Sequence, residues 1–234
     1  MFRIRILVPA VALILTLCLL PAQAEPLFRG REAIPSDAVI LFDGKNLSSW
    51  AYTGSDKPAD WKLAKGYMQA RGGDIRTKAD FGDCQLHVEF WLPLMADKSG
   101  QGRANSGVFL QGNYEVQVLD SYGLKSEVGD CGAIYSIHTP LVNACRPPEN
   151  WQTYDIFFHA PRFDATGKKT ANARLSVLQN GVWIHENADV PSPTASHGAP
   201  DPQKPGPIVL QDHGCPVRYR NVWVRPLGEE SPKP

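Results

Sequence analysis

Apolar and polar residues alternate along much of the chain. In residues 84–92 and 114–119 every second position is apolar, the period of a strand that buries one face. The apolar positions of these two segments are Leu86, Val88, Phe90, Leu92, Tyr114, Val116 and Val118. Two strands with one buried face each are therefore predicted here.

Turn signals separate such runs. Asn180-Gly181 lies between two alternating segments, and both residues readily take the positive φ angles of a two-residue hairpin turn. We find no long run with the 3.6-residue period of a helix. Further short strands are expected near 38–42, 61–69, 106–111, 132–137, 152–159, 173–178, 207–212 and 218–225. Together these patterns predict an all-β protein, a two-sheet antiparallel sandwich or jelly roll.

Composition places the chain among ordinary globular proteins. Hydrophobic residues make up 43% and charged residues 21%, and the 20 Gly and 20 Pro suit many turns between short elements. Lys and Arg together number 24, as do Asp and Glu, so the formal net charge is zero. Without a basic excess to hold a phosphate backbone, no nucleic-acid partner is expected.

The first 24 residues have the three parts of a secretory signal peptide. Arg3 and Arg5 precede an uncharged stretch at 6–20, and Ala22 and Ala24 provide a small-residue cleavage site. The stretch is about 15 residues long, shorter than the ~20 of a membrane helix, so no membrane span is expected after cleavage. We expect a periplasmic or secreted protein. The predicted organisation is a signal peptide at 1–24, a lead-in at 25–37, one jelly-roll domain at 38–227 and a flexible tail at 228–234.

Export would leave four cysteines, at positions 84, 131, 145 and 215. An oxidising compartment permits disulfides, and four cysteines allow three connectivities. The preferred pair is Cys131–Cys145, because it closes a short loop, and free buried thiols are the alternative. The sequence has no CxxC pair, which disfavours a structural zinc site.

The segment 114–123 carries the most informative polar residues. If its apolar positions fill the core, Glu115 and Gln117 point to the opposite face. A bulge at Leu119 would turn Asp120 onto that face as well. Two carboxylates on one face suit acid–base work on a glycosidic bond. The alternative is a polar, solvated surface strand.

This spacing is partly similar to the E-x-D-x-x-E strand motif of laminarinase-type retaining glycosidases, with Gln117 and Asp120 replacing its last two carboxylates. A longer series of blocks points to another family. The blocks are LFDGKNLSSW at 41–50, ANSGVFLQGNYEVQVLDSYG at 104–123, GDCGAIYS at 129–136, PPENWQTYDIFFHAPRFD at 147–164, VLQNGVWIHEN at 177–187 and LQDHGCPVRYRNVWVRPL at 210–227. In this order they resemble the 3-keto-disaccharide hydrolase domain family. The resemblance implies a concanavalin A-like jelly roll of two antiparallel sheets and action on 3-keto-glycosides.

The chemistry of such a substrate assigns roles to the candidate residues. A ketone at C3 acidifies the hydrogen on C2, so a base can form an enolate that expels the C1 substituent, after which water adds. Glu115 is the expected base. Asp120 is a second acid or base, or a metal ligand. His213 would polarise the ketone or protonate the leaving oxygen.

Other side chains suit sugar hydroxyls or rings. The candidate substrate-binding residues are Asn105, Gln111, Gln117, Gln211, Trp151 and Arg218. A turn cap at Asn105, core packing of Trp151 and a buried ion pair of Arg218 are the alternatives. The sequence requires no cofactor, but a divalent metal is compatible with it. Its oxygen and nitrogen ligands would come from Glu115, Asp120, Asp130, Asp212 and His213.

Two functions therefore remain open, an enzyme with a carbohydrate substrate and a lectin-like binding domain without turnover, because one fold can serve both. The carboxylates and His213 favour the enzyme, whereas a binding domain would need aromatic platforms. A structural domain of a surface complex is a third reading, and the polar strand face disfavours it.

Overall fold

The structure is a computed structural model that describes residues 34–194 and 200–228. Within these ranges the regular structure is β-strand, apart from one short 3-10 helix, η1 (Gly100–Gly102), which confirms the all-β class. No helix in the described ranges is long and apolar enough to cross a membrane. The predicted signal peptide and most of the predicted lead-in and tail lie outside the described residues.

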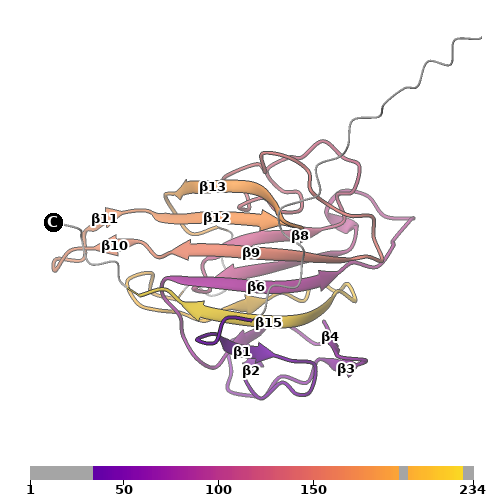
Figure 1. Ribbon diagram of the computed structural model, residues 1–234, viewed down its shortest axis with the longest axis horizontal. Coiled ribbons are helices and arrows are strands. Elements are labelled where there is room, and N and C mark those ends of the chain that lie inside the picture. Colours follow the sequence, from indigo (N-terminus) through magenta and orange to yellow (C-terminus); the bar gives the residue numbers. More distant parts are fainter. Residues whose placement is uncertain (1–33, 195–199, 229–234) are drawn as a thin grey trace, which may run out of the picture.

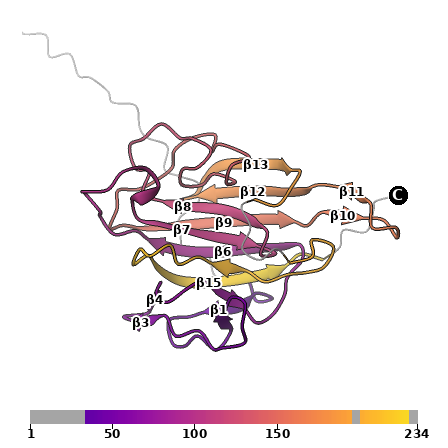
Figure 2. The ribbon, with the colours of Figure 1, turned by 180° about the vertical axis from the view of Figure 1, so that it is seen from behind.

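The strands form two main layers, seen from opposite sides in Figures 1 and 2. The larger sheet has eight strands, and β1 pairs with β15 beside the main path. Its strands, in spatial order, are β13 (Val182–Val190), β12 (Ala173–Gln179), β9 (Trp151–His159), β6 (Cys84–Trp91), β15 (Arg218–Pro226), β4 (Tyr67–Gln69) and β3 (Lys62–Ala64), with β1 (Val39–Phe42).

The smaller sheet has five strands. Their spatial order is β2 (Trp50–Tyr52), β5 (Ile75–Thr77), β14 (Val209–Leu210), β7 (Asn105–Leu110) and β8 (Tyr114–Leu119). A separate pair joins β10 (Arg162–Phe163) to β11 (Lys169–Ala171). All pairings are antiparallel, as expected for a jelly-roll sandwich.

The core lies between the two sheets. Along β6 the side chains alternate between buried and half-buried, with Val88 and Phe90 fully enclosed, as the sequence pattern predicts. Burying each such side chain contributes roughly 1.5–3 kcal/mol. Across the core, the rings of Tyr114 on β8 and Phe158 on β9 lie 5.3 Å apart. These contacts fix β8 over the larger sheet.

Two hairpin loops contain residues with positive φ angles. Asn180 and Gly181 have φ angles of 54° and 80° and join β12 to β13, so the predicted hairpin is confirmed. Between β7 and β8 the loop is one residue longer, 111–113, and its first two residues, Gln111 and Gly112, have φ angles of 53° and 62°. Gln111 therefore occupies a strained backbone position that the sequence analysis did not assign to it.

The predicted disulfide is absent from the structure, because all four cysteines of the described residues are free. The preferred pair nevertheless lies together. Gln179 Nε2 is 3.5 Å from Cys131 Sγ and 3.4 Å from Cys145 Sγ, and a hydrogen bond joins the two thiols. Pairing of Cys131 with Cys145 under oxidising conditions thus remains a prediction.

Candidate active site

Glu115 lies on the outer face of the five-stranded sheet. Tyr114, Val116 and Val118 are buried in the core, so Glu115 and Gln117 point the other way. Both are nevertheless covered, with only 4% and 2% of their surface exposed. This face is therefore a buried polar layer and not a solvated surface strand.

A glycine makes room for the Glu115 carboxylate. A Cβ added at Gly107, on the neighbouring strand β7, would lie 2.4 Å from Glu115 Oε1 and 2.9 Å from a ring carbon of Phe109. Both contacts are closer than packed atoms allow, so a larger residue would displace the carboxylate. Sequence reasoning missed this role. The available signal was a glycine inside a strand, which often marks a close approach.

Flanking segments fix the backbone of Glu115. Its N–H donates to Thr194 Oγ1 at 2.9 Å, and its carbonyl accepts from the N–H of Tyr135 at 3.2 Å. The Thr194 hydroxyl in turn donates to the carbonyl of Asn113 at 3.1 Å. Strand β8 is thus held along its outer edge, which positions the carboxylate.

Amide side chains form a network beside this carboxylate. Asn105 Nδ2 donates to the backbone and side-chain oxygens of Gln101, both at 3.0 Å. Gln117 Nε2 donates to Gln101 Oε1 at 3.1 Å and to the carbonyl of Gly129 at 3.3 Å. Asn105 Oδ1 is buried without a hydrogen-bond partner. An unused buried acceptor is costly and suits a hydroxyl donor from a ligand. Sequence reasoning missed Gln101, because η1 has no periodic pattern.

Gln211 and His213 belong to the loop after β14. The N–H of Gln211 donates to the carbonyl of Gly107 at 3.0 Å, which places Gln211 next to the glycine under the carboxylate. The Asp212 carboxylate accepts from the N–H of Gly73 at 2.9 Å and fixes the loop. Gln211 is half-buried and His213 is exposed. His213 is therefore open to solvent near the buried polar layer.

Asp120 does not join Glu115. The β7–β8 pairing continues without a register shift to Asn105↔Leu119, and the N–H of Asp120 extends it by donating to the carbonyl of Ala104 at 3.0 Å. The predicted bulge at Leu119 is therefore wrong. Regular alternation turns the Asp120 side chain toward the core side of the strand, so the predicted carboxylate pair does not form.

Gln111 is tied into the fold and not turned toward Glu115. Its Nε2 donates to the carbonyl of Pro202 at 3.2 Å and also to the carbonyl of Lys204. These bonds hold the 200–207 segment against the β7–β8 turn. A structural anchor accounts for the observed contacts of Gln111.

Trp151 and Arg218 lie on the other side of the sandwich. Trp151 begins β9 and Arg218 begins β15, and both stand on the outer face of the eight-stranded sheet. The core separates them from Glu115. The structure therefore divides the predicted substrate-binding residues into two groups on opposite faces.

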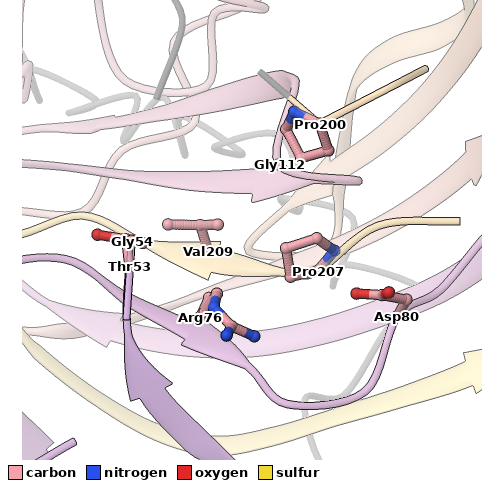
Figure 3. A pocket seen from close by; sticks show the side chains of 8 residues that line it. All are labelled: Thr53, Gly54, Arg76, Asp80, Gly112, Pro200, Pro207 and Val209. Atoms are coloured by element: carbon pink, nitrogen blue, oxygen red, sulfur yellow. The ribbon is translucent and has the colours of Figure 1, made fainter. Parts of the chain in front are cut away.

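A pocket of about 270 Å³ opens on the same sheet as Glu115. In Figure 3, Arg76 and Asp80 point toward one another below Pro207. The remaining lining residues are Thr53, Gly54, Gly112, Pro200 and Val209. Phe109 pairs with both Val209 and Glu115 and is fully buried, so it separates the pocket from the carboxylate.

No metal cluster is found among residues 34–194 and 200–228. In these ranges no three His, Cys, Asp or Glu side chains gather closely enough to hold an ion. The candidate ligands named from the sequence therefore do not form a group of three in these ranges.

Comparison with known proteins identifies the family. The family model for a 3-keto-alpha-glucoside-1,2-lyase-like domain matches residues 37–225. The chain belongs to this family. The expected resemblance is thus confirmed, and the protein is a carbohydrate hydrolase-like or carbohydrate-binding domain.

Two crystal structures illustrate the likeness. A candidate glycosyl hydrolase from Parabacteroides distasonis ATCC 8503 is 41% identical, with a TM-score of 0.75, and the match covers 82% of this chain and 84% of that chain. Another candidate glycosyl hydrolase from the same organism is 23% identical, with a TM-score of 0.56, over 81% of this chain and 99% of that chain, and it shows the shared fold alone. The comparison with curated proteins found no match.

Proposed function

We propose that the protein is an exported carbohydrate-active enzyme that cleaves 3-keto-glycosides, 3-keto-disaccharides among them, by elimination followed by hydration. One observation carries the proposal. Within a domain of this family, the Glu115 carboxylate is held over Gly107, next to Gln211. A carboxylate fixed among amides on one sheet face can act as a positioned base toward a sugar.

Glu115 would begin the reaction by removing the proton from C2 of the 3-keto sugar. The electron pair of that C–H bond forms the C2–C3 double bond of an enolate, and the charge moves to the C3 oxygen. Hydrogen-bond donors stabilise such an oxygen best when they are already in place. We assign this task to the side-chain amide of Gln211, whose backbone lies next to Gly107, and not to Gln117, whose Nε2 already donates to Gln101 and Gly129.

The enolate then expels the substituent at C1. Its electron pair re-forms the C3 carbonyl and makes a C1–C2 double bond, while the C1–O bond breaks. His213 would protonate the leaving oxygen, and water would add at C1 as C2 regains a proton. The sum is hydrolysis without a redox change, and the description of the family as lyase-like supports the elimination half.

Asn105 would contribute to substrate binding. Its Oδ1 is a buried acceptor without a partner, so it suits a sugar hydroxyl. Neither Asp120 nor Gln111 enters this proposal, because regular β7–β8 pairing turns Asp120 away from Glu115 and the Gln111 side chain holds the 200–207 segment. The chemistry needs no electron-accepting cofactor, and a divalent metal would serve as an alternative stabiliser of the enolate oxygen.

The test uses the mature protein, a 3-keto-disaccharide and the parent disaccharide without the ketone, each with and without chelator. We expect sugar release from the keto substrate only, because the parent has no acidic C2 hydrogen. In deuterated water, the released 3-keto sugar should carry deuterium at C2. Cleavage of the parent would contradict elimination. Saturable binding without release would favour the lectin-like alternative.

A further inference from the structure

Five residues gather on the outer face of the eight-stranded sheet, away from Glu115. We call them the arginine–aromatic cluster, and they are Tyr67 on β4, Trp91 on β6, Trp151 on β9, and Arg218 and Arg220 on β15. Figure 1 shows β4, β15, β6 and β9 of this sheet. All five side chains are partly exposed. The proposed function does not use this cluster.

Stacking fixes both guanidinium groups. The Arg218 guanidinium carbon lies 3.9 Å from the ring centroid of Trp91 and 4.9 Å from that of Tyr67. The Arg220 guanidinium carbon lies 4.0 Å from the ring centroid of Trp151. Stacking occupies the flat faces of a guanidinium and leaves its N–H groups, which lie in its plane, free to donate. The guanidinium groups of Arg218 and Arg220 are therefore held in place before any ligand binds.

The two arginines differ in their charge partners. Arg220 Nε donates to Glu89 Oε2 at 2.6 Å, which balances its charge. Arg218 Nε donates to the neutral Gln69 Oε1 at 3.4 Å. Within the described ranges Arg218 has no carboxylate partner. A guanidinium carries five N–H donors, so most donors of Arg218 remain available.

We propose that the arginine–aromatic cluster is a second carbohydrate site that binds a carboxylate-bearing sugar unit, such as a uronic acid in an acidic oligosaccharide. The fork of Arg218 would take the carboxylate in two parallel hydrogen bonds. The partly exposed rings of Trp91 and Trp151 would contact the apolar face of the sugar ring. The unbalanced charge favours an acidic sugar over a neutral one, and the zero net charge of the chain argues against a general polyanion surface.

The test is a titration of the mature protein with tri-galacturonate, followed by calorimetry and by tryptophan fluorescence. The neutral control is the same trisaccharide with its carboxyl groups reduced. We expect saturable binding of the acidic sugar only, weakened by salt. Arg218→Ala should weaken it at least about tenfold, the usual loss for a charged hydrogen bond. The matched control is Arg174→Ala, which removes an exposed arginine from β12 of the same sheet and should not affect binding.

Gln69→Glu is a second variant that keeps the stacking. It places a carboxylate next to Arg218 Nε, so it should abolish binding while the unfolding temperature is maintained. Glu115→Gln should bind tri-galacturonate normally, which separates this site from the proposed active site. Equal binding of the neutral trisaccharide, equal competition by inorganic phosphate, or unchanged binding by Arg218→Ala and Gln69→Glu would each overturn the proposal.

Discussion

Oxidation of Cys131 and Cys145 to a disulfide should stabilise the folded protein. The two thiols already share a hydrogen bond and both contact Gln179 Nε2. Burial opposes ionisation of Cys131, but hydrogen bonds from Cys145 and Tyr154 hold its pKa below that of an ordinary cysteine. In the reaction each thiol gives up its proton, and the pair gives two electrons to oxidised glutathione, which is released as two thiols.

The expected gain follows from the loop that the bond closes. Cys131 and Cys145 enclose 15 residues, and a loop of that length is worth about 3 kcal/mol in the chain-entropy model. For a protein of this size, each kcal/mol shifts the unfolding temperature by about 2–4 °C, so the oxidised form should unfold about 6–12 °C higher. Because a disulfide would weaken the hydrogen bonds from Gln179 Nε2 to the two sulfurs, we expect the rise in unfolding temperature to lie toward about 6 °C.

The assay compares thermal unfolding of the mature protein after incubation with reduced or oxidised glutathione. Peptide mass spectrometry identifies the linked cysteines. Cys84 is an internal control, because burial raises the pKa of its thiol to about 12 and keeps it unreactive. Cys145→Ser should show no oxidation-dependent shift. A different linkage, or a Cys131–Cys145 bond that leaves the unfolding temperature unchanged, would refute the reasoning.

Two further predictions follow from single buried residues. Gly107→Ala should slow turnover of a 3-keto-disaccharide at least about tenfold by displacing the Glu115 carboxylate. The control Gly82→Ala should behave as wild type, because a Cβ at Gly82 meets nothing within 4 Å. Equal activity of the two variants would contradict the role of Gly107 in making room for Glu115. Burial lowers the pKa of His185, which hydrogen-bonds to the carbonyl of Gly132. As the pH falls, the imidazole of His185 is therefore protonated in the unfolded chain before it is protonated in the folded protein. Thermal stability should fall as the pH drops below about 6.5. His185→Gln should lessen that fall, and an unchanged pH profile would show that another group causes it.

Local patterns were sufficient for much of the fold. The alternation along β6 predicted its buried positions, and Asn180-Gly181 predicted a hairpin, because both signals depend only on sequence neighbours. The same rule placed Glu115 on the outer face of its sheet. It could not show that other segments bury this face, since Thr194 and Tyr135 reach β8 from distant parts of the sequence.

The parts of the candidate site that the sequence did not reveal depend on register and on long-range packing. Asp120 would have joined Glu115 only through a bulge, and the regular β7–β8 pairing excludes it. Trp151 and Arg218 are suitable residue types for sugar binding, but strand order places them on the other sheet. Gly107 has no side chain, and its importance appears only once the Glu115 carboxylate is located above it.

Turnover of a 3-keto-disaccharide by Glu115→Gln tests the central claim most directly. The substitution keeps the size of the side chain but removes the base, so sugar release should slow by at least about 10²-fold with the fold intact. Asp120→Asn is the matched control, a carboxylate that directly follows β8 in regular pairing with β7, and it should turn over at close to the wild-type rate. A folded Glu115→Gln variant that releases sugar as fast as wild type, or an equal loss in Asp120→Asn, would contradict the assignment of Glu115 as the base.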